Sequence, residues 1–312
     1  MAAAPLPRLG LGAAALGNLY AAMSDGDAAA TLEAAGADAW VDTAPYYGHG
    51  LSERRIGGFL RAGLGRRLRL STKVGRRLEP DPAPPDHGFA SPDPFRPVFD
   101  YSFDGALRSF DASLARLGVT RVETLLLHDV GRQVHGVRHA EVMAQAERGA
   151  WAAMRRLKAE GAVERVGVGV NEVEVCFEAL ERFGPDVILL AGRHTLLDRS
   201  AERAGLLDAC AAGGVTYLAA APFNSGLLAG GAHFDYAPAE AATAARARRL
   251  AEACRARGVD LTAAALQFPL RNPAVAAVLA GARSAAELHT QTSALGTAIP
   301  DDLWAELEAA AA

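Results

Sequence analysis

Three strand-like runs of this chain end in side chains that can hold or move protons. Ala39–Asp42 ends in a carboxylate, Leu68–Lys73 in an ammonium group and Thr124–His128 in an imidazole, and Tyr47 follows the first run by five residues. An ammonium group beside a phenol favours the phenolate and lowers the phenol pKa from about 10. A tyrosine tuned in this way can exchange a proton with a carbonyl or hydroxyl oxygen while the attached carbon gains or loses hydride.

These four side chains suggest a division of labour. In this hypothesis Tyr47 exchanges the proton, Lys73 tunes Tyr47, Asp42 holds and compensates Lys73, and His128 orients the reacting oxygen. Each residue alone has a simpler explanation, as a loop cap, a solvated charge or a satisfied polar group. Their joint occurrence favours the catalytic interpretation, because titratable groups with perturbed pKa values cluster at functional sites.

The elements that must position these residues alternate between strand and helix patterns. The strand-like runs are Leu9–Gly12, Ala39–Asp42, Leu68–Lys73, Thr124–His128, Arg165–Val170, Val187–Leu190, Val215–Ala220 and Val275–Ala280. Helical patterns such as Phe103–Leu117 lie between them, and several end at a glycine, a common helix terminator. Short apolar runs alternating with helices indicate parallel strands. Eight such units predict a (β/α)8 TIM barrel as a single domain over residues 1–312, with its active site at the carboxyl ends of the strands.

A proline-rich segment interrupts this rhythm. Seven prolines lie between Gly75 and Tyr101, so the segment can form neither a helix nor a central strand. We therefore predict a long loop over about residues 75–101. The loop follows Lys73 directly and must emerge on the active-site face, where a lid or a substrate-binding loop is typical; an ordered but inert insertion is the alternative.

Composition narrows the class of protein. The 312 residues carry a net charge of −4, which offers no basic surface to nucleic acid or to an anionic membrane. The three cysteines (Cys176, Cys210 and Cys254) are far apart, which favours a reducing compartment and hence a cytoplasmic location. The chain has two long stretches without charged side chains. Glycines interrupt both of them, so we expect no membrane-spanning helix. His135 and His139 have the spacing of a zinc pair but lack an obvious third ligand, so we predict no metal site.

The order Asp42, Tyr47, Lys73 and His128, each at or just beyond a strand end, resembles the catalytic tetrad of the aldo-keto reductases. The resemblance covers nearly the whole chain, from Leu9 to about residue 295, and it implies NAD or NADP as the cofactor. A classical dinucleotide fold does not explain the cofactor, because the Gly167-Val168-Gly169 sequence lacks the third glycine of that fingerprint.

The resemblance places the cofactor along the later strands of the barrel. Asn171 ends the fifth strand, where its amide can bond the nicotinamide carboxamide, and residues 221–228 resemble the loop whose backbone N–H groups meet the pyrophosphate. Residues 281–291 resemble the segment that contacts the adenosine ribose at a helix N-terminus. The implied cofactor contacts are Asn171, Phe223, Ser225, Gly226, Leu228, Gly281, Arg283, Glu287 and Gln291. An alanine, Ala220 or Ala221, stands where the family often stacks a tyrosine on the nicotinamide.

The same segment indicates a preference for NAD over NADP. Family members that prefer NADP often carry a lysine and an arginine where this chain has Gly281 and Glu287. A carboxylate would repel a 2′-phosphate, yet it can accept hydrogen bonds from a free ribose hydroxyl. Arg283 opposes this prediction, because an arginine turned inward would bind the phosphate.

Four motifs narrow the resemblance to the aldose 1-dehydrogenase group, whose members act on sugars of the L-fucose and D-threo-aldose type; L-galactose and pyridoxal dehydrogenases are similar. The motifs are Leu16–Tyr20, Asp100–Asp104, Ala191–Leu197 and Phe223–Leu228. The resemblance implies oxidation of the C1 hydroxyl of an aldose to a lactone. The alternatives are pyridoxal oxidation, general aldehyde or ketone reduction and, from another class, a catalytically silent regulatory barrel.

The substrate pocket predicted with this function lies at the mouth of the barrel. We expect it to involve Asn18, Leu19, Trp40 and Tyr46, together with the proline-rich loop. We expect the protein to bind a small-molecule substrate and neither nucleic acid nor a membrane. We expect it to be a monomer or a small homo-oligomer.

Overall fold

The computed structural model describes residues 6–63 and 67–311, and its centre is a closed barrel of eight parallel strands. Each strand pairs in parallel with both neighbours, and β1 closes the barrel by pairing with β12 on one side and β2 on the other. The barrel strands in spatial order are β1 (Leu9–Gly12), β12 (Val275–Gly281), β9 (Thr216–Ala220), β8 (Val187–Ala191), β7 (Val163–Val170), β6 (Val122–His128), β3 (Arg69–Val74) and β2 (Trp40–Asp42). All eight strands predicted from the sequence are present, so the barrel prediction is confirmed.

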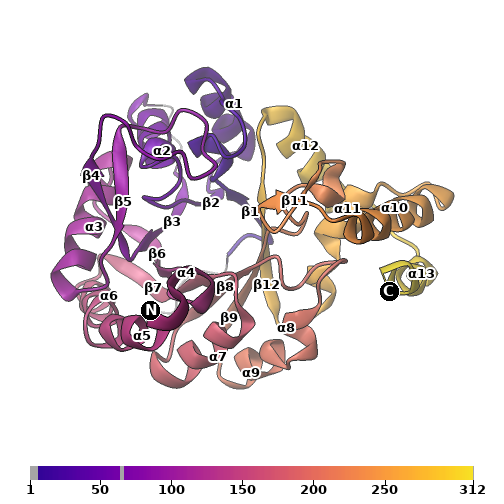
Figure 1. The fold of residues 1–312 in the computed structure, drawn as a ribbon. Coiled ribbons are helices and arrows are strands. Elements are labelled where there is room, and N and C mark those ends of the chain that lie inside the picture. Colours follow the sequence, from indigo (N-terminus) through magenta and orange to yellow (C-terminus); the bar gives the residue numbers. More distant parts are fainter. Residues whose placement is uncertain (1–5, 64–66, 312) are drawn as a thin grey trace.

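Helices surround the barrel (Figure 1). They are α1 (Asp25–Ala35), α2 (Leu51–Arg61), α3 (Phe103–Leu117), α4 (Arg132–His135), α5 (His139–Arg148), α6 (Ala150–Ala159), α7 (Val173–Arg182), α8 (Ser200–Arg203), α9 (Leu206–Ala212), α10 (Ala241–Ala256), α11 (Leu261–Gln267), α12 (Ala285–Ala294) and α13 (Asp301–Ala311). Figure 1 shows α10, α11 and α13 together on one side of the barrel. Among the described residues, none of the helices is both long and apolar enough to cross a membrane.

Local sequence explains where the helices begin and end. Ser102 caps α3 by accepting a hydrogen bond from the backbone N–H of Gly105. The same helix ends at Leu117, and Gly118 takes the left-handed conformation (φ 69°) that only glycine adopts without strain. The segment before β9 forms two short helices, α8 and α9, because Gly205 turns the chain between them with a φ of 76°.

The proline-rich segment needs a correction. It contains a two-stranded antiparallel hairpin, β4 (Arg76–Pro80) and β5 (Phe95–Phe99), rather than a loop throughout. Prolines occur in both strands because an isolated hairpin has free edges, where a missing N–H does not break a central ladder. Figure 1 places the hairpin beside the barrel. The hairpin lies at the end of the barrel where β6 ends, since Arg76 at the start of β4 contacts His128.

The core has two parts that fix the strand ends in space. One part fills the barrel interior, with Trp40, Leu126, Leu189, Leu218 and Leu279 among its members, and the other lies between the barrel and the surrounding helices. The residues of β6 and β7 form near-continuous apolar runs, because both faces of these strands are buried. Residues at the carboxyl ends of the strands are therefore held on a rigid frame.

Candidate functional site

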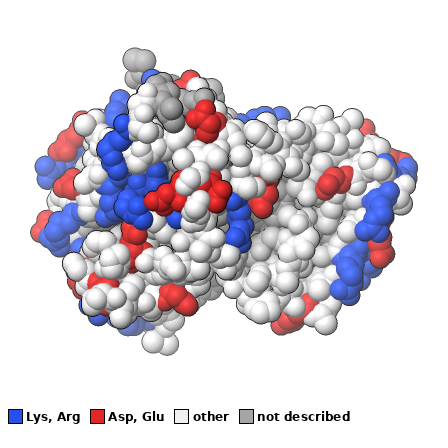
Figure 2. Space-filling view, turned by 90° about the horizontal axis from the view of Figure 1, so that it is seen from above, with Lys and Arg blue, Asp and Glu red and all other residues white. Residues whose placement is uncertain are grey.

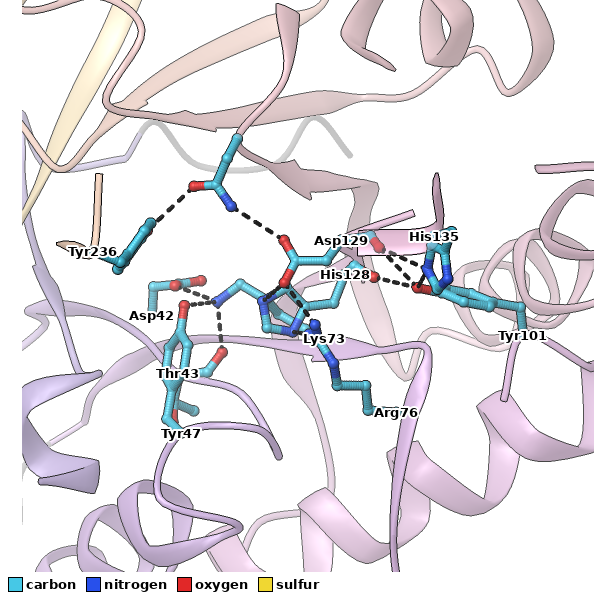
Figure 3. Close-up of polar contacts among 11 residues, drawn as sticks. Asp42, Thr43, Tyr47, Lys73, Arg76, Tyr101, His128, Asp129, His135 and Tyr236 are labelled. Atoms are coloured by element: carbon cyan, nitrogen blue, oxygen red, sulfur yellow. Dashed lines mark hydrogen bonds and ion pairs between the residues drawn. The ribbon is translucent and has the colours of Figure 1, made fainter. Parts of the chain in front are cut away.

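Lys73 is the centre of the predicted catalytic group. Its ammonium group is almost completely buried and donates three hydrogen bonds: to Oδ2 of Asp42 at 2.5 Å, to the carbonyl of Thr43 at 2.9 Å and to the hydroxyl of Tyr47 at 3.0 Å. An ammonium group has three N–H bonds, so every donor is used. Figure 3 shows these contacts converging from the ends of β2 and β3.

A second layer holds Asp42 in place. Its Oδ1 accepts a hydrogen bond from the hydroxyl of Ser71 at 2.7 Å, and Ser71 in turn accepts one from the indole N–H of Trp40 at 3.2 Å. Trp40 is 1% exposed and belongs to the barrel interior. The prediction that Trp40 contacts substrate is therefore corrected: it lies one layer below Asp42 on the same face of β2, because residues two apart on a strand share a face.

The charge on Lys73 is secured by its neighbours. Burial alone would lower its pKa, but Asp42 and then Tyr47 outweigh burial, so the pKa of Lys73 lies above its ordinary value. For Tyr47 the sequence-based expectation was a lowered pKa, and the structure differs. Burial raises the pKa of the Tyr47 hydroxyl, and Lys73 only partly offsets this effect. Without ligand Tyr47 is therefore a protonated phenol beside a permanent cation.

His128 completes the predicted set. Its ring lies edge-on to the ring of Tyr47, with centroids 5.9 Å apart, at the carboxyl end of β6. Burial lowers the pKa of His128 well below its ordinary value; Asp129 opposes this effect, and the positive charges of Arg76 and Lys73 add to it. The imidazole is therefore neutral at physiological pH. All four predicted residues meet in one place, which is the geometry their strand-end positions predict.

Sequence reasoning did not identify the role of Asp129, although it directly follows His128. Asp129 adopts a positive φ of 46°, and its carboxylate accepts hydrogen bonds from Arg76 at 2.9 Å and from the amide of Asn171 at 3.4 Å. Its side chain is 13% exposed. Burial would raise the pKa of Asp129, but the nearby positive groups keep it below its ordinary value, so the carboxylate is ionised.

Asn171, the predicted nicotinamide contact, directly follows β7 at the carboxyl end of that strand. The structure links its amide to the catalytic group through Asp129, and its Oδ1 accepts a hydrogen bond from the hydroxyl of Tyr236 at 3.2 Å. Tyr236 belongs to the turn between the short strands β10 (His233–Phe234) and β11 (Ala237–Pro238). Nothing in the sequence pattern pointed to Tyr236, because its approach depends on how this hairpin folds back over the barrel.

The remaining predicted substrate residues have different surroundings. Tyr46 is partly exposed beside the catalytic group, with its ring edge-on to His128 and its centroid 4.2 Å from the guanidinium carbon of Arg76. Leu19 pairs through its backbone with Phe89 of the proline-rich segment. Asn18 is 3% exposed; its amide nitrogen donates to the carbonyl of Ala90, and its amide oxygen accepts from the N–H of Met23 and from Arg55. We therefore correct the assignment of Asn18: it holds its loop together rather than facing a substrate.

The predicted pyrophosphate loop comes directly after β9. Ser225 and Gly226 are partly exposed and have φ values of 58° and 96°, and space is open beside the Cα of Gly226. The side chains of Phe223 and Leu228 are packed into the core, so these two residues can meet a cofactor only through their backbone. Backbone N–H groups and a glycine that permits close approach are the features that suit a phosphate.

The predicted adenosine segment begins at the end of β12. Ser284 caps α12 by accepting from the N–H of Glu287, and the Glu287 carboxylate accepts from the N–H of Arg283 at 2.8 Å. The Arg283 side chain is exposed and makes no hydrogen bond or ion pair within the described part of the chain. Gly281 is exposed at the strand end, and its carbonyl accepts from the amide of Gln291 at 2.8 Å.

Two orphaned polar atoms test whether a dinucleotide fits here. Oε1 of Gln291 on α12 and Oδ1 of Asn224 in the loop after β9 are buried acceptors without a hydrogen-bond partner. Buried polar atoms are nearly always satisfied, so these unpaired acceptors fit a ligand that brings N–H or O–H donors, as a dinucleotide does with its ribose hydroxyls and amide groups. No group of three or more potential metal ligands converges among residues 6–63 and 67–311. On the face shown in Figure 2, acidic and basic side chains are interspersed.

The structure is thus a parallel (β/α)8 barrel with a buried Asp–Lys–Tyr chain and a neighbouring histidine at the carboxyl ends of its strands. The sequence profile of the Aldo/keto reductase family matches residues 8–312. The chain belongs to this family, whose members use NAD(P)H, and it is an oxidoreductase enzyme.

Three curated relatives match nearly the whole chain. Pyridoxal 4-dehydrogenase of Microbacterium luteolum is 42% identical, covering 96% of this chain and 92% of that protein. D-threo-aldose 1-dehydrogenase of a Pseudomonas species is 38% identical over 97% and 93% of the two chains. L-galactose dehydrogenase of Arabidopsis thaliana is 28% identical over 92% and 83%.

Solved structures agree with the fold. An aldo-keto reductase from Bacillus halodurans in its holo form superposes with a TM-score of 0.74 at 21% identity, covering 98% of this chain and 93% of that chain. The glycerol dehydrogenase of Gluconobacter oxydans gives a TM-score of 0.73 at 20% identity, covering 98% and 92%. At such identities the likeness concerns the fold alone.

Proposed function

We propose that this enzyme oxidises the C1 hydroxyl of a cyclic aldose, of the L-fucose or D-threo-aldose type, to the lactone with NAD(P) as the oxidant. The observation that carries the proposal is the continuous contact from Asp42 through Lys73 to the Tyr47 hydroxyl, at 2.5 and 3.0 Å. The permanent cation stabilises the phenolate form of Tyr47, and the phenolate can take the hydroxyl proton from the substrate.

The residues of the chain have separate tasks in this reaction. Tyr47 accepts the proton of the C1 hydroxyl, and Lys73 stabilises the phenolate that must exist beforehand. His128, neutral and buried, donates a hydrogen bond to the same substrate oxygen and fixes its position. When bound, the cofactor supplies the hydride acceptor for the electron pair of the C1–H bond. We assign Asn171 to its nicotinamide carboxamide, Ser225 and Gly226 to its pyrophosphate, and the segment from Gly281 to Gln291 to its adenosine half.

The carboxylate of Asp129 and the names of two similar proteins support a sugar as the substrate. Asp129 presents an ionised carboxylate beside His128, and such an oxygen accepts hydrogen bonds from the hydroxyl groups of a polyol. Two of the similar proteins are named for aldose and L-galactose oxidation. Tyr46 and Leu19 supply apolar surface for the sugar ring. We further propose that the enzyme acts as a single barrel domain in the cytoplasm, in keeping with its three free, buried cysteines.

Pyridoxal is the second candidate substrate, because the relative at 42% identity is named for it. Its aldehyde closes onto the neighbouring hydroxymethyl group, so it too presents a cyclic hemiacetal. The same residues would serve both oxidations, and the aromatic ring of Tyr46 would face a pyridine ring as readily as a sugar ring.

A rate measurement with several substrates tests this proposal. Formation of reduced cofactor is followed by absorbance with L-fucose, L-galactose, D-arabinose and pyridoxal, each with NAD and with NADP. Reduction of simple aldehydes is measured in parallel. We expect the highest kcat/KM with an aldose and NAD. Faster turnover of pyridoxal would move the assignment to the second candidate. Tight cofactor binding without turnover of any substrate would support a regulatory barrel instead.

A further inference from the structure

Arg76, at the start of the β4–β5 hairpin, reaches the catalytic histidine. One guanidinium nitrogen lies 3.1 Å from Nδ1 of His128, and the other terminal nitrogen donates to Oδ2 of Asp129 at 2.9 Å. The arginine is 6% exposed although it belongs to the proline-rich segment outside the barrel. Figure 3 shows it approaching the histidine from the side opposite Tyr236.

The guanidinium group has little freedom to turn. Its central carbon lies 4.2 Å from the ring centroid of Tyr46 and 4.7 Å from that of Phe99, so two aromatic rings contact it. The backbone carbonyl of Arg76 accepts a hydrogen bond from the hydroxyl of Ser109 on α3. A planar group fixed in this way presents its N–H bonds in one direction.

The direction of the hydrogen bond to His128 decides where the imidazole keeps its proton. A guanidinium group has five N–H donors and no acceptor, so Nδ1 of His128 must accept and carry no hydrogen. A neutral imidazole has one N–H, which must then be on Nε2. Nε2 lies 3.6 Å from Oδ2 of Asp129, beyond hydrogen-bond distance, so its N–H is available to a substrate oxygen.

We propose that Arg76 is a positioning residue that holds His128 as the neutral Nε2–H tautomer, ready to donate to the oxygen of the substrate. The role of the hydrogen bond to substrate rests on the function proposed above, whereas the tautomer itself does not. Through Arg76, the proline-rich hairpin therefore contributes to the acid–base chemistry of the site.

The charged and titratable groups around His128 determine the effect of removing Arg76. They are Lys73 from β3, Asp129 after β6, and Tyr46 and Tyr47 after β2. Loss of Arg76 removes a positive charge and leaves Asp129 without its ion-pair partner, and both changes favour a proton on His128. Nδ1, freed of its donor, would then become protonated as pH falls toward the ordinary histidine range.

Nuclear magnetic resonance of protein labelled with 15N-histidine tests the tautomer directly, without substrate or turnover. His128→Asn identifies the His128 signals among the eight histidines. In the wild type we expect Nδ1 to have the shift of an unprotonated nitrogen and Nε2 that of a protonated one from about pH 5.5 to about pH 8. In Arg76→Met we expect Nδ1 to gain a proton within this range. A protonated Nδ1 in the wild type, or an unchanged Nδ1 in Arg76→Met, would overturn the proposal.

Kinetics then separates positioning from simple packing. Imidazolium also carries hydrogen on Nε2, so the kcat of Arg76→Met relative to wild type should recover as pH falls. We expect the kcat of Arg76→Met to be about 10-fold or more below that of the wild type near pH 8, and the loss to be smaller near pH 5.5. Residues that orient metal-bound histidines have effects of this size. A residue with only a packing role would give the same ratio at every pH, which would contradict the proposal.

Two further variants complete the test. Arg76→Lys keeps the charge and one donor, so we expect partial rescue of the kcat ratio. Arg96→Met removes an arginine that is 55% exposed and paired with Glu79 in the same hairpin, and it should leave both the tautomer and kcat unchanged. If no substrate is turned over by the wild type, the function proposal fails while the labelled-histidine result still decides the tautomer.

Discussion

The catalytic group and the residues assigned to the cofactor are built differently. On the catalytic side, Asp42, Lys73 and Ser71 are buried and bonded to one another, and the donors of Lys73 are all used without any ligand. On the cofactor side, Ser225 and Arg283 are accessible, and Gln291 retains an unpaired buried acceptor. The acid–base group is thus formed in advance, whereas the cofactor side needs a ligand to satisfy its polar atoms.

This difference has a physical reason. A buried charge without a partner costs several kcal/mol, so the ammonium and carboxylate groups must be paired even in the free enzyme. Loops at the end of the barrel can keep exposed or unpaired groups at lower cost, because water reaches most of them. Changes on the catalytic side should therefore reduce turnover strongly, and changes on the cofactor side should mainly alter cofactor choice.

The largest effect is expected from Lys73→Met. The change removes the cation that stabilises the Tyr47 phenolate, and we expect kcat to fall about 10²–10⁴-fold, the usual contribution of an acid–base step. It also leaves Asp42 buried without its partner, so the melting temperature should fall as well. The double variant Asp42→Asn with Lys73→Met removes both charges and should regain stability but not activity. Recovery of activity in the double variant would contradict the role of Lys73.

A smaller but still large effect is expected from Gly17→Ala. A methyl group at Gly17 would lie 2.5 Å from the carbonyl carbon of Tyr47 and 2.7 Å from the N–H nitrogen of Gly48, so the turn that carries Tyr47 must shift. A displacement near 1 Å can cost about 10²-fold in kcat. The control is Gly58→Ala on α2, where space is open; it should leave kcat unchanged and slightly raise stability. Equal behaviour of the two variants would show that the turn tolerates movement.

The positions of the candidate site residues could be predicted from the sequence better than their surroundings. Strand ends could be predicted because apolar runs have a clear length and end in a polar residue. Trp40 was misassigned because it shares a face with Asp42, and alternation along a strand does not reveal depth within a barrel. Asn18 was misassigned because its partners, Ala90 and Arg55, are remote in sequence. Arg76 was missed because its contact with His128 depends on a hairpin in a segment that was predicted to be a loop.

The pH dependence of the oxidation should show a rising limb. Burial raises the pKa of Tyr47, and oxidation needs the phenolate, so kcat/KM should increase about tenfold per pH unit from about pH 6 to about pH 9. Lys73 should not produce a falling limb in this range, because its pKa is raised and it stays charged. A profile measured with a three-component buffer at constant ionic strength checks this expectation. A plateau reached below about pH 7 would contradict it.

The smallest effect is expected on cofactor choice. Glu287→Gln keeps an acceptor for the N–H of Arg283 but removes the negative charge, so kcat/KM with NADP relative to NAD should rise about threefold to tenfold. Arg283→Ala should lower the same ratio if that arginine contacts a 2′-phosphate. A wild-type preference for NADP that Arg283→Ala abolishes would show that Arg283 dominates over Glu287.

The most direct test of the central claim is Tyr47→Phe. The change removes one hydroxyl group and keeps the ring that contacts Lys73 and His128. We predict a loss of about 10²–10⁴-fold in kcat, with the cofactor dissociation constant and the melting temperature close to those of the wild type. A variant that retains near-wild-type kcat would show that Tyr47 does not exchange the proton and would contradict the assignment of this site.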